Sequence, residues 1–160
     1  MANFNAAFTA LIGNEGGYSN NPHDPGGETM WGVTKRVAVA AGYTGAMRDM
    51  PLATAQAIAK REYWDKFQCD ALPDALAFQV LDAAYNGGFP AKWLQNAVGV
   101  HPDGHIGQAT IQAANAMDPA RSVLRFLAYR LAYMTTLRTW PTFGKGWAAR
   151  ISRNMLKGAV

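Results

Sequence analysis

The sequence predicts a mainly helical protein with one small β element near residues 18–33. Over most of the chain, apolar side chains recur at the spacing of three and four residues that an amphipathic helix needs. Residues 18–27 are instead rich in Asn, Pro and Gly, which is typical of a loop, and residues 29–33 read as an extended segment. With 160 residues, 49% of them hydrophobic, the chain can form one domain with a sizeable core.

The first predicted helix follows from four apolar residues at helical spacing: Phe4, Phe8, Leu11 and Ile12. Asn3 is a candidate N-cap for it. Gly16 and Gly17 are expected to stop the helix, which would place Glu15 at its end. A carboxylic acid at a helix end, facing a polar loop, is well placed to donate a proton.

Three further helices are predicted in the middle of the chain. Thr34 is expected to cap a short one, and a second is expected over residues 52–67. The third, over residues 74–86, is apolar on nearly every face, which predicts a buried central helix. Its polar residues Asp82 and Asn86 are four apart and share a face. They either bond internally or line a wet cleft.

The last part of the chain predicts four helices. Their expected ranges are 90–98, 107–117, 119–138 and 146–157. Pro141 is expected to end the third of these. The sequence contains few convincing strands, no repeat and no low-complexity segment.

Charge is distributed unevenly. All 11 acidic residues lie at or before Asp118, so residues 1–118 carry 7 − 11 = −4 and the last 42 residues carry +8. Such a basic segment indicates a polyanionic partner, or simply a solvated helix face. Residues 148–157 in particular predict a short basic amphipathic helix that could engage anionic outer-membrane or wall polymers.

Several classes of protein and site are disfavoured. The single cysteine, Cys69, excludes an internal disulfide framework and fits synthesis in a reducing cytoplasm. No apolar run approaches the ~20 residues that span a bilayer, and no signal peptide is evident. No nucleic-acid-binding motif or phosphate-binding glycine loop is present. We therefore expect no nucleic-acid partner and release from the cytoplasm by separate means.

A metal site is the main alternative that the histidines of the sequence offer. His101, Asp103 and His105 cluster in the sequence, and His23 lies beside Asp24. However, zinc sites need an ordered set of three or four ligands, and the residues around Asp103 read as a turn. We expect neither a metal nor another cofactor.

The strongest chemical pattern is that of glycoside cleavage, which needs a protonated acid over the leaving oxygen and a group that positions water or stabilises charge. Glu15 is the candidate acid, if burial raises its pKa. Asp24 and Thr29 are candidates for holding the attacking water. The candidate sugar-binding residues are Tyr18, Trp31, Tyr63, Trp64 and Asn86. Each also has an ordinary structural reading: a helix end, a turn or a core aromatic.

The order of residues in this region closely resembles the glycoside hydrolase 108 family. The first block reads Glu15-Gly16-Gly17-Tyr18, Asn21-Pro22, Asp24, Gly26-Gly27-Glu28-Thr29 and Trp31-Gly32-Val33-Thr34. The resemblance continues to Arg130 and Gly146-Trp147, so it extends over essentially the whole chain. It implies a lysozyme-like fold and identifies Glu15 as the catalytic acid.

That resemblance also implies a function. Members are N-acetylmuramidases, common as phage endolysins, which cut the β-1,4 bond between N-acetylmuramic acid and N-acetylglucosamine in peptidoglycan. It divides the chain into a catalytic region, residues 1–90, and a peptidoglycan-binding region, residues 91–160. A bacteriolytic monomer is expected. The alternatives are a lytic transglycosylase using the same Glu15, a non-catalytic wall-binding protein, and a secreted bacterial toxin of the same family.

Overall fold

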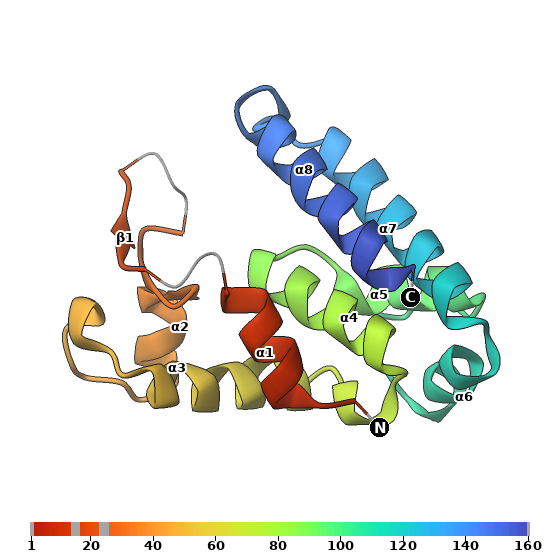
Figure 1. Cartoon of the computed structure of the whole chain (residues 1–160), viewed down its shortest axis with the longest axis horizontal. Helices are drawn as coiled ribbons and strands as arrows, with labels where there is room; N and C mark the ends of the chain where they lie inside the picture. Colours follow the sequence, from red (N-terminus) through yellow and green to blue (C-terminus); the bar gives the residue numbers. More distant parts are fainter. Residues whose placement is uncertain (1, 14–16, 23–25, 160) are drawn as a thin grey trace. The chain divides into compact units, whose positions relative to one another are not determined.

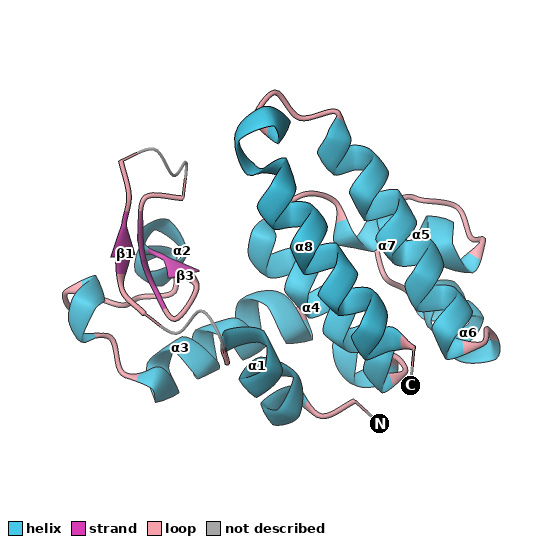
Figure 2. Cartoon of the chain, turned by 45° about the horizontal axis from the view of Figure 1, so that its top comes forward, coloured by secondary structure: helices cyan, strands magenta, loops and turns pink. Residues whose placement is uncertain are grey.

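The computed structural model describes residues 2–13, 17–22 and 26–159 (Figure 1). Within these residues the protein is mainly helical with one small antiparallel sheet, so the predicted fold class is confirmed (Figure 2). The chain forms two compact units, an N-terminal unit of residues 3–66 and a C-terminal unit of residues 67–160 with residues 1–2. None of the described helices is long and apolar enough to cross a bilayer.

Helix α1 (Phe4–Ile12) opens the N-terminal unit. The side chain of Asn3 accepts a hydrogen bond from the backbone N–H of Ala6 at 3.1 Å, as its predicted role of N-cap requires. The helix ends earlier than predicted, because the N–H of Gly13 already closes its last turn. The expectation that Gly16 and Gly17 stop this helix is therefore wrong.

The predicted β element is a three-stranded antiparallel sheet in the order β1 (Ser19–Asn20), β2 (Glu28–Met30), β3 (Val33–Thr34). Strands β2 and β3 are joined by Trp31 and Gly32, whose φ angles are 53° and 75°. Two successive left-handed residues are what a two-residue hairpin turn of type I′ needs. Glycine meets that need without strain, whereas tryptophan does not.

Two helices follow the sheet. Thr34 caps α2 (Lys35–Ala40), as predicted, by accepting a hydrogen bond from the N–H of Val37. After a 3₁₀ turn, α3 (Leu52–Ala59) continues into a π-helical segment, η2 (Lys60–Asp65). The sequence predicted the extent of this helix but not its change of winding.

The described part of the C-terminal unit consists of helices joined by turns and loops, with no strand. After a 3₁₀ turn at Cys69–Ala71 it contains α4 (Asp74–Asn86), α5 (Pro90–Val98), α6 (Gln108–Ala116), α7 (Pro119–Thr135) and α8 (Trp140–Gly158). Helix α4 is buried along most of its length and packs against α5, α7 and α8, so its prediction as a central helix is confirmed. Figures 1 and 2 show α7 and α8 side by side.

Helix α8 begins at Trp140, six residues before its predicted start. Pro141 lies in its first turn, where the missing N–H of proline has no helical partner to lose. The prediction that Pro141 ends the preceding helix is wrong, because α7 already ends at Thr135.

The turn after α5 is held by one buried amide, that of Gln95. Its Nε2 donates to the carboxylate of Asp103 at 2.6 Å and to the carbonyl of His105 at 3.0 Å. Its Oε1 accepts from the N–H of Gly104 at 2.8 Å. The hydrogen bond from Gln95, followed by the one from the backbone N–H of His105, lowers the pKa of the Asp103 carboxyl below its ordinary value. The carboxylate is therefore part of a structural turn.

Gln95→Ala is expected to lower the free energy of unfolding by about 1–3 kcal/mol, because it leaves buried polar groups of this turn without partners. Gln112→Ala, an exposed change of the same type on α6, is expected to stay within about 0.5 kcal/mol of the wild type. Urea unfolding measures both. Equal stability of the two variants would show that Gln95 does not hold the turn.

Candidate active site

Thr29 is the one predicted catalytic residue that the described part of the chain contains; Glu15 and Asp24 lie outside it. Thr29 occupies the middle of β2 and pairs with Ser19 of β1 and Thr34 of β3. Strands on both sides therefore fix its backbone, and its side chain is partly exposed. A hydroxyl meant to hold a water molecule benefits from such a rigid position.

A carboxylate with no predicted role, that of Glu28, lies next to Thr29 in the sequence. Glu28 accepts a hydrogen bond from the hydroxyl of Tyr18 at 2.9 Å and one from the ammonium of Lys35 at 3.0 Å. The guanidinium of Arg48 lies 4.9 Å from the centre of the Tyr18 ring. The network joins the residue before β1 to β2 and α2.

The same network keeps Glu28 ionised. The hydrogen bond from Lys35, followed by that from Tyr18, lowers the pKa of Glu28 below its ordinary value. A general acid must hold its proton at the working pH, so Glu28 is poorly suited to that role. Its position instead fixes the ring of Tyr18, one of the predicted sugar-binding aromatics.

Trp31 is held in an unusual conformation at the tip of the β2–β3 hairpin. Its φ of 53° lies in the left-handed region, which costs a non-glycine residue about 1–2 kcal/mol. Its indole N–H donates to the carbonyl of Met50 at 2.9 Å, and the ring remains partly exposed. A strained residue with a fixed, accessible ring is a candidate for ligand contact.

The other predicted sugar-binding residues have different surroundings. Tyr63 is partly exposed in η2, and burial raises the pKa of its phenol, with the charge of Glu62 adding to the effect. Trp64 is fully buried and packs edge-on against Phe4, with ring centres 5.4 Å apart. Its environment is that of a core residue. Asn86 lies in the C-terminal unit, at the end of α4.

The C-terminal unit contains a buried charged cluster that the sequence only partly indicated. Arg130 of α7 donates to the carboxylate of Asp82 at 2.5 Å, and Asn154 of α8 donates to the same oxygen at 3.0 Å. Arg150 of α8 lies 3.7 Å from the other carboxylate oxygen. Asn86 donates to the backbone carbonyl of Asp82 at 2.7 Å. Three helices therefore converge on one carboxylate.

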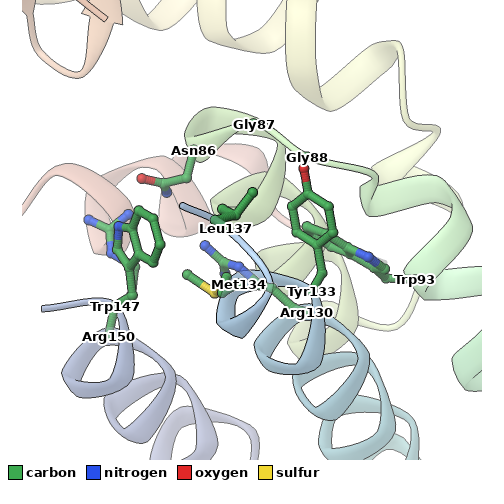
Figure 3. A pocket seen from close by; sticks show the side chains of 10 residues that line it. All are labelled: Asn86, Gly87, Gly88, Trp93, Arg130, Tyr133, Met134, Leu137, Trp147 and Arg150. Carbon is green, nitrogen blue, oxygen red and sulfur yellow. The ribbon is translucent and has the colours of Figure 1, made fainter. Parts of the chain in front are cut away.

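A cavity of about 240 Å³ opens beside this cluster (Figure 3). We call it the Arg130 pocket; it is lined by Asn86, Gly87, Gly88, Trp93, Arg130, Tyr133, Met134, Leu137, Trp147 and Arg150. The polar residues of α4 were expected either to form internal hydrogen bonds or to line a cleft. Asn86 does both, because it bonds to the backbone of Asp82 and also lines the cavity.

Comparison with known proteins identifies the family. The model of the family described as Glycosyl hydrolase 108 matches residues 8–88. The chain belongs to the glycosyl hydrolase 108 family. A solved structure, that of Brucella abortus SagA, is 34% identical to it, with a TM-score of 0.89 over 98% of this chain and 93% of that one. A comparison with curated proteins found no match.

Membership makes this chain a glycoside hydrolase with a lysozyme-like fold of the glycosyl hydrolase 108 type, as the sequence predicted. The matched segment contains the whole first block of motifs, including Thr29 and the Tyr18–Glu28 pair, and reaches the end of α4. The matched segment therefore includes the predicted catalytic residues. It ends at Gly88, one of the first three residues in the sequence that line the Arg130 pocket.

Nothing in the described part of this glycosyl hydrolase 108 chain resembles a metal centre. Residues 2–13, 17–22 and 26–159 contain no group of three or more His, Cys, Asp or Glu side chains placed to hold an ion. Asp103 is engaged by Gln95 instead, and Cys69 is buried. His23, the fourth residue weighed for a zinc site, lies outside the described residues.

Lys35→Met is expected to lower the melting temperature at neutral pH, because it removes the cation that keeps Glu28 ionised. A depressed pKa stabilises the fold above the ordinary value of 4.5, and that contribution is lost as pH falls through the folded pKa. The difference between variant and wild type should therefore shrink in acid. Thermal melts of both proteins from neutral to acid pH measure it.

The matched control for that series is Lys66→Met, which changes an exposed lysine of the same unit outside this network. Its melting temperature should follow that of the wild type at every pH. A Lys35→Met deficit that stays constant into acid would show that Glu28 is not held ionised by Lys35.

Asp82→Asn is expected to lower the free energy of unfolding by about 3–5 kcal/mol, because it leaves the Arg130 guanidinium buried without its counter-ion. Asp74→Asn, at the exposed start of the same helix, is expected to cost no more than about 1 kcal/mol. Chemical denaturation measures both. A small loss for Asp82→Asn would mean that the cluster does not hold α4, α7 and α8 together.

Proposed function

We propose that this glycoside hydrolase is an N-acetylmuramidase, which hydrolyses the β-1,4 bond between N-acetylmuramic acid and N-acetylglucosamine in peptidoglycan. Glu15 protonates the leaving oxygen, and a water molecule held near Asp24 and Thr29 attacks the anomeric carbon. The observation that carries the proposal is the family match over residues 8–88, which contains this block of motifs.

The described geometry supports this assignment of the acid. Glu28 is engaged by Tyr18 and Lys35 and has a lowered pKa, which disfavours it as a proton donor. Glu15 is the other glutamic acid of the first block. Thr29, fixed at the middle of the sheet, offers a hydroxyl at a constant position.

We assign sugar contacts to the partly exposed aromatics Tyr18, Trp31 and Tyr63, whose rings suit the apolar faces of sugars. Trp64, fully buried in the N-terminal unit, is left out of this set. The region of residues 91–160 is proposed to bind the wall, with Asn86 just before it.

The biological role that we propose is lysis of a bacterial cell, as by an endolysin, by a monomer that needs no cofactor. The resemblance to phage enzymes favours this role. A secreted bacterial enzyme is the alternative, and the similar structure from Brucella abortus comes from a bacterium.

Only the last turns of the basic helix α8 are suited to the predicted contact with anionic polymers. Arg150 lies in the buried cluster with Asp82 and not on an open face, while Lys157 lies 4.5 Å from the centre of the Phe78 ring. Arg153 is exposed, and Leu156, three residues further along α8, exposes 73% of its surface. We propose that Arg153, Leu156 and Lys157 contact anionic outer-membrane or wall polymers.

Glu15→Gln is expected to reduce the rate of peptidoglycan cleavage about 10²–10⁴-fold, the usual contribution of a general acid. Mass spectrometry of digested peptidoglycan should show reducing N-acetylmuramic acid ends from the wild type and almost none from the variant. The matched control, Glu62→Gln, changes the remaining glutamate of the chain and should keep the wild-type products.

Other reaction products would indicate one of the alternative functions. Anhydro ends from the wild type would make the protein a lytic transglycosylase that uses the same acid. Equal products from Glu15→Gln and the wild type would remove Glu15 from the mechanism. Binding to peptidoglycan with no cleavage by the wild type would make the chain a wall-binding protein.

A further inference from the structure

We propose that the Arg130 pocket binds a carboxylate of the peptide stem of peptidoglycan, so that the enzyme recognises the peptide as well as the glycan. This inference rests on the proposed function, because it takes peptidoglycan as the substrate. It assigns a ligand class to a cavity of the C-terminal unit.

The decisive observation is an unpartnered guanidinium nitrogen. The side chain of Arg130 is only 2% exposed, and its Nη1 donates to Asp82. Its Nη2 is buried and has no hydrogen-bond partner among the described residues. Buried polar groups of native proteins are nearly always bonded, so this one calls for an acceptor. Figure 3 shows the Arg130 guanidinium among the residues that line the pocket, between Trp147 and Tyr133.

The side chains that line the pocket limit the class of ligand that it can bind. Apart from the arginines and Asn86, the side chains around the pocket are apolar or aromatic, with the rings of Trp93, Tyr133 and Trp147 as its largest members. An unpartnered guanidinium nitrogen among rings suits a small apolar group that bears a single carboxylate. Arg150 adds a second positive charge to the wall.

Size restricts the ligand further. At about 240 Å³ the pocket falls below the ~300–1,000 Å³ of sites that enclose whole drug-sized ligands. It can therefore take one residue of a larger polymer, such as an amino acid with its carboxylate, but not a run of sugars.

The aromatic wall of the pocket is held by packing within the C-terminal unit. The backbone of Gly88 has a φ of 96°, and a Cβ there would clash with the Trp93 ring. Trp93 in turn packs against Tyr133 and Phe126, with ring centres 5.4 Å and 6.2 Å away. A wall packed in this way does not need to be ordered on binding, which favours affinity.

The carboxylates of peptidoglycan come from two sources, and the peptide is the better fit. In intact peptidoglycan the lactyl carboxyl of N-acetylmuramic acid is consumed in the amide bond to the stem. The free carboxylates therefore lie on the amino acids of the stem, beside small apolar groups. A phosphate, with up to two charges, would be better matched by several free cations than by one nitrogen among rings.

The binding test uses the full chain with ¹⁵N-labelled tryptophan, whose indole N–H signals report on Trp93 and Trp147. The probes are a stem tetrapeptide, the same peptide with every carboxylate amidated, and a peptide-free disaccharide that keeps its lactyl carboxylate. We expect the acid tetrapeptide to shift both signals and the amidated form to leave them unmoved. Equal binding of the two forms, no binding, or binding of the disaccharide alone would each overturn the proposal.

The matched variants are Leu137→Glu and Leu124→Glu. Leu137 lines the pocket, so a carboxylate there should repel the ligand and weaken tetrapeptide binding about tenfold or more. Leu124 is 58% exposed on α7 and does not line the pocket, so the same change there should leave binding unchanged. Equal binding by the two variants would overturn the proposal.

Arg130→Gln tests the nitrogen itself, with folding checked by thermal melting because the variant also loses the contact to Asp82. If it remains folded, it should lose tetrapeptide binding; retained binding by folded Arg130→Gln would contradict the proposal. The Leu137→Glu result stands on its own if Arg130→Gln does not fold.

An activity measurement separates this proposal from the proposed function. The wild type should cleave intact peptidoglycan faster, at limiting substrate, than glycan strands stripped of their stems, and Leu137→Glu should lose that preference. Equal cleavage of both substrates by the wild type would overturn the stem site yet leave the muramidase in place. No cleavage of either substrate, with tetrapeptide still bound, would instead overturn the proposed function.

Discussion

One buried carboxylate organises the C-terminal unit. Asp82 lies on α4 and accepts hydrogen bonds from Arg130 of α7 and Asn154 of α8, so a single side chain links three helices. A carboxylate in this setting is stable only with its partners, since an unpaired buried charge costs several kcal/mol. The same link orients the Arg130 guanidinium so that one nitrogen faces Asp82 and the other is left for a ligand of the pocket. Arg130 thus stabilises the packing of the helices and, in our proposal, also binds the ligand.

Local rules predicted much of the fold. The near absence of a polar face identified α4 as a buried central helix, and the caps at Asn3 and Thr34 formed as expected. The predictions failed where two residues compete for the same role. Gly13 closes α1 before the later glycines can act, and Pro141 lies in the first turn of α8 instead of ending α7. The π-helical winding of η2 has no counterpart in hydrophobic spacing, because it changes the hydrogen bonding of the helix rather than its apolar face.

The site was predicted less completely, because its contacts are distant in the sequence. Asp82 stood out as a polar residue on an apolar helix, but its partner Arg130 lies 48 residues further on and nothing local singles it out. Glu28 belongs to the family motif, but its role could not be predicted, since only the fold brings Tyr18 and Lys35 to its two oxygens. Trp64 was a candidate sugar contact because an aromatic ring suits the apolar face of a sugar, whereas tertiary packing buries its side chain. Motifs identify which residues matter, while burial and pairing decide what each one does.

The central claim is that Glu15 carries the proton and Glu28 does not, and an NMR titration tests it most directly. Selective ¹³C labelling of the glutamate carboxyls gives one signal for each of the three glutamates, Glu15, Glu28 and Glu62. We predict that the pKa of Glu28 lies below its ordinary value, that the pKa of Glu15 lies above it, and that cleavage is lost as Glu15 deprotonates. A Glu15 that is fully ionised throughout the active pH range would contradict the account.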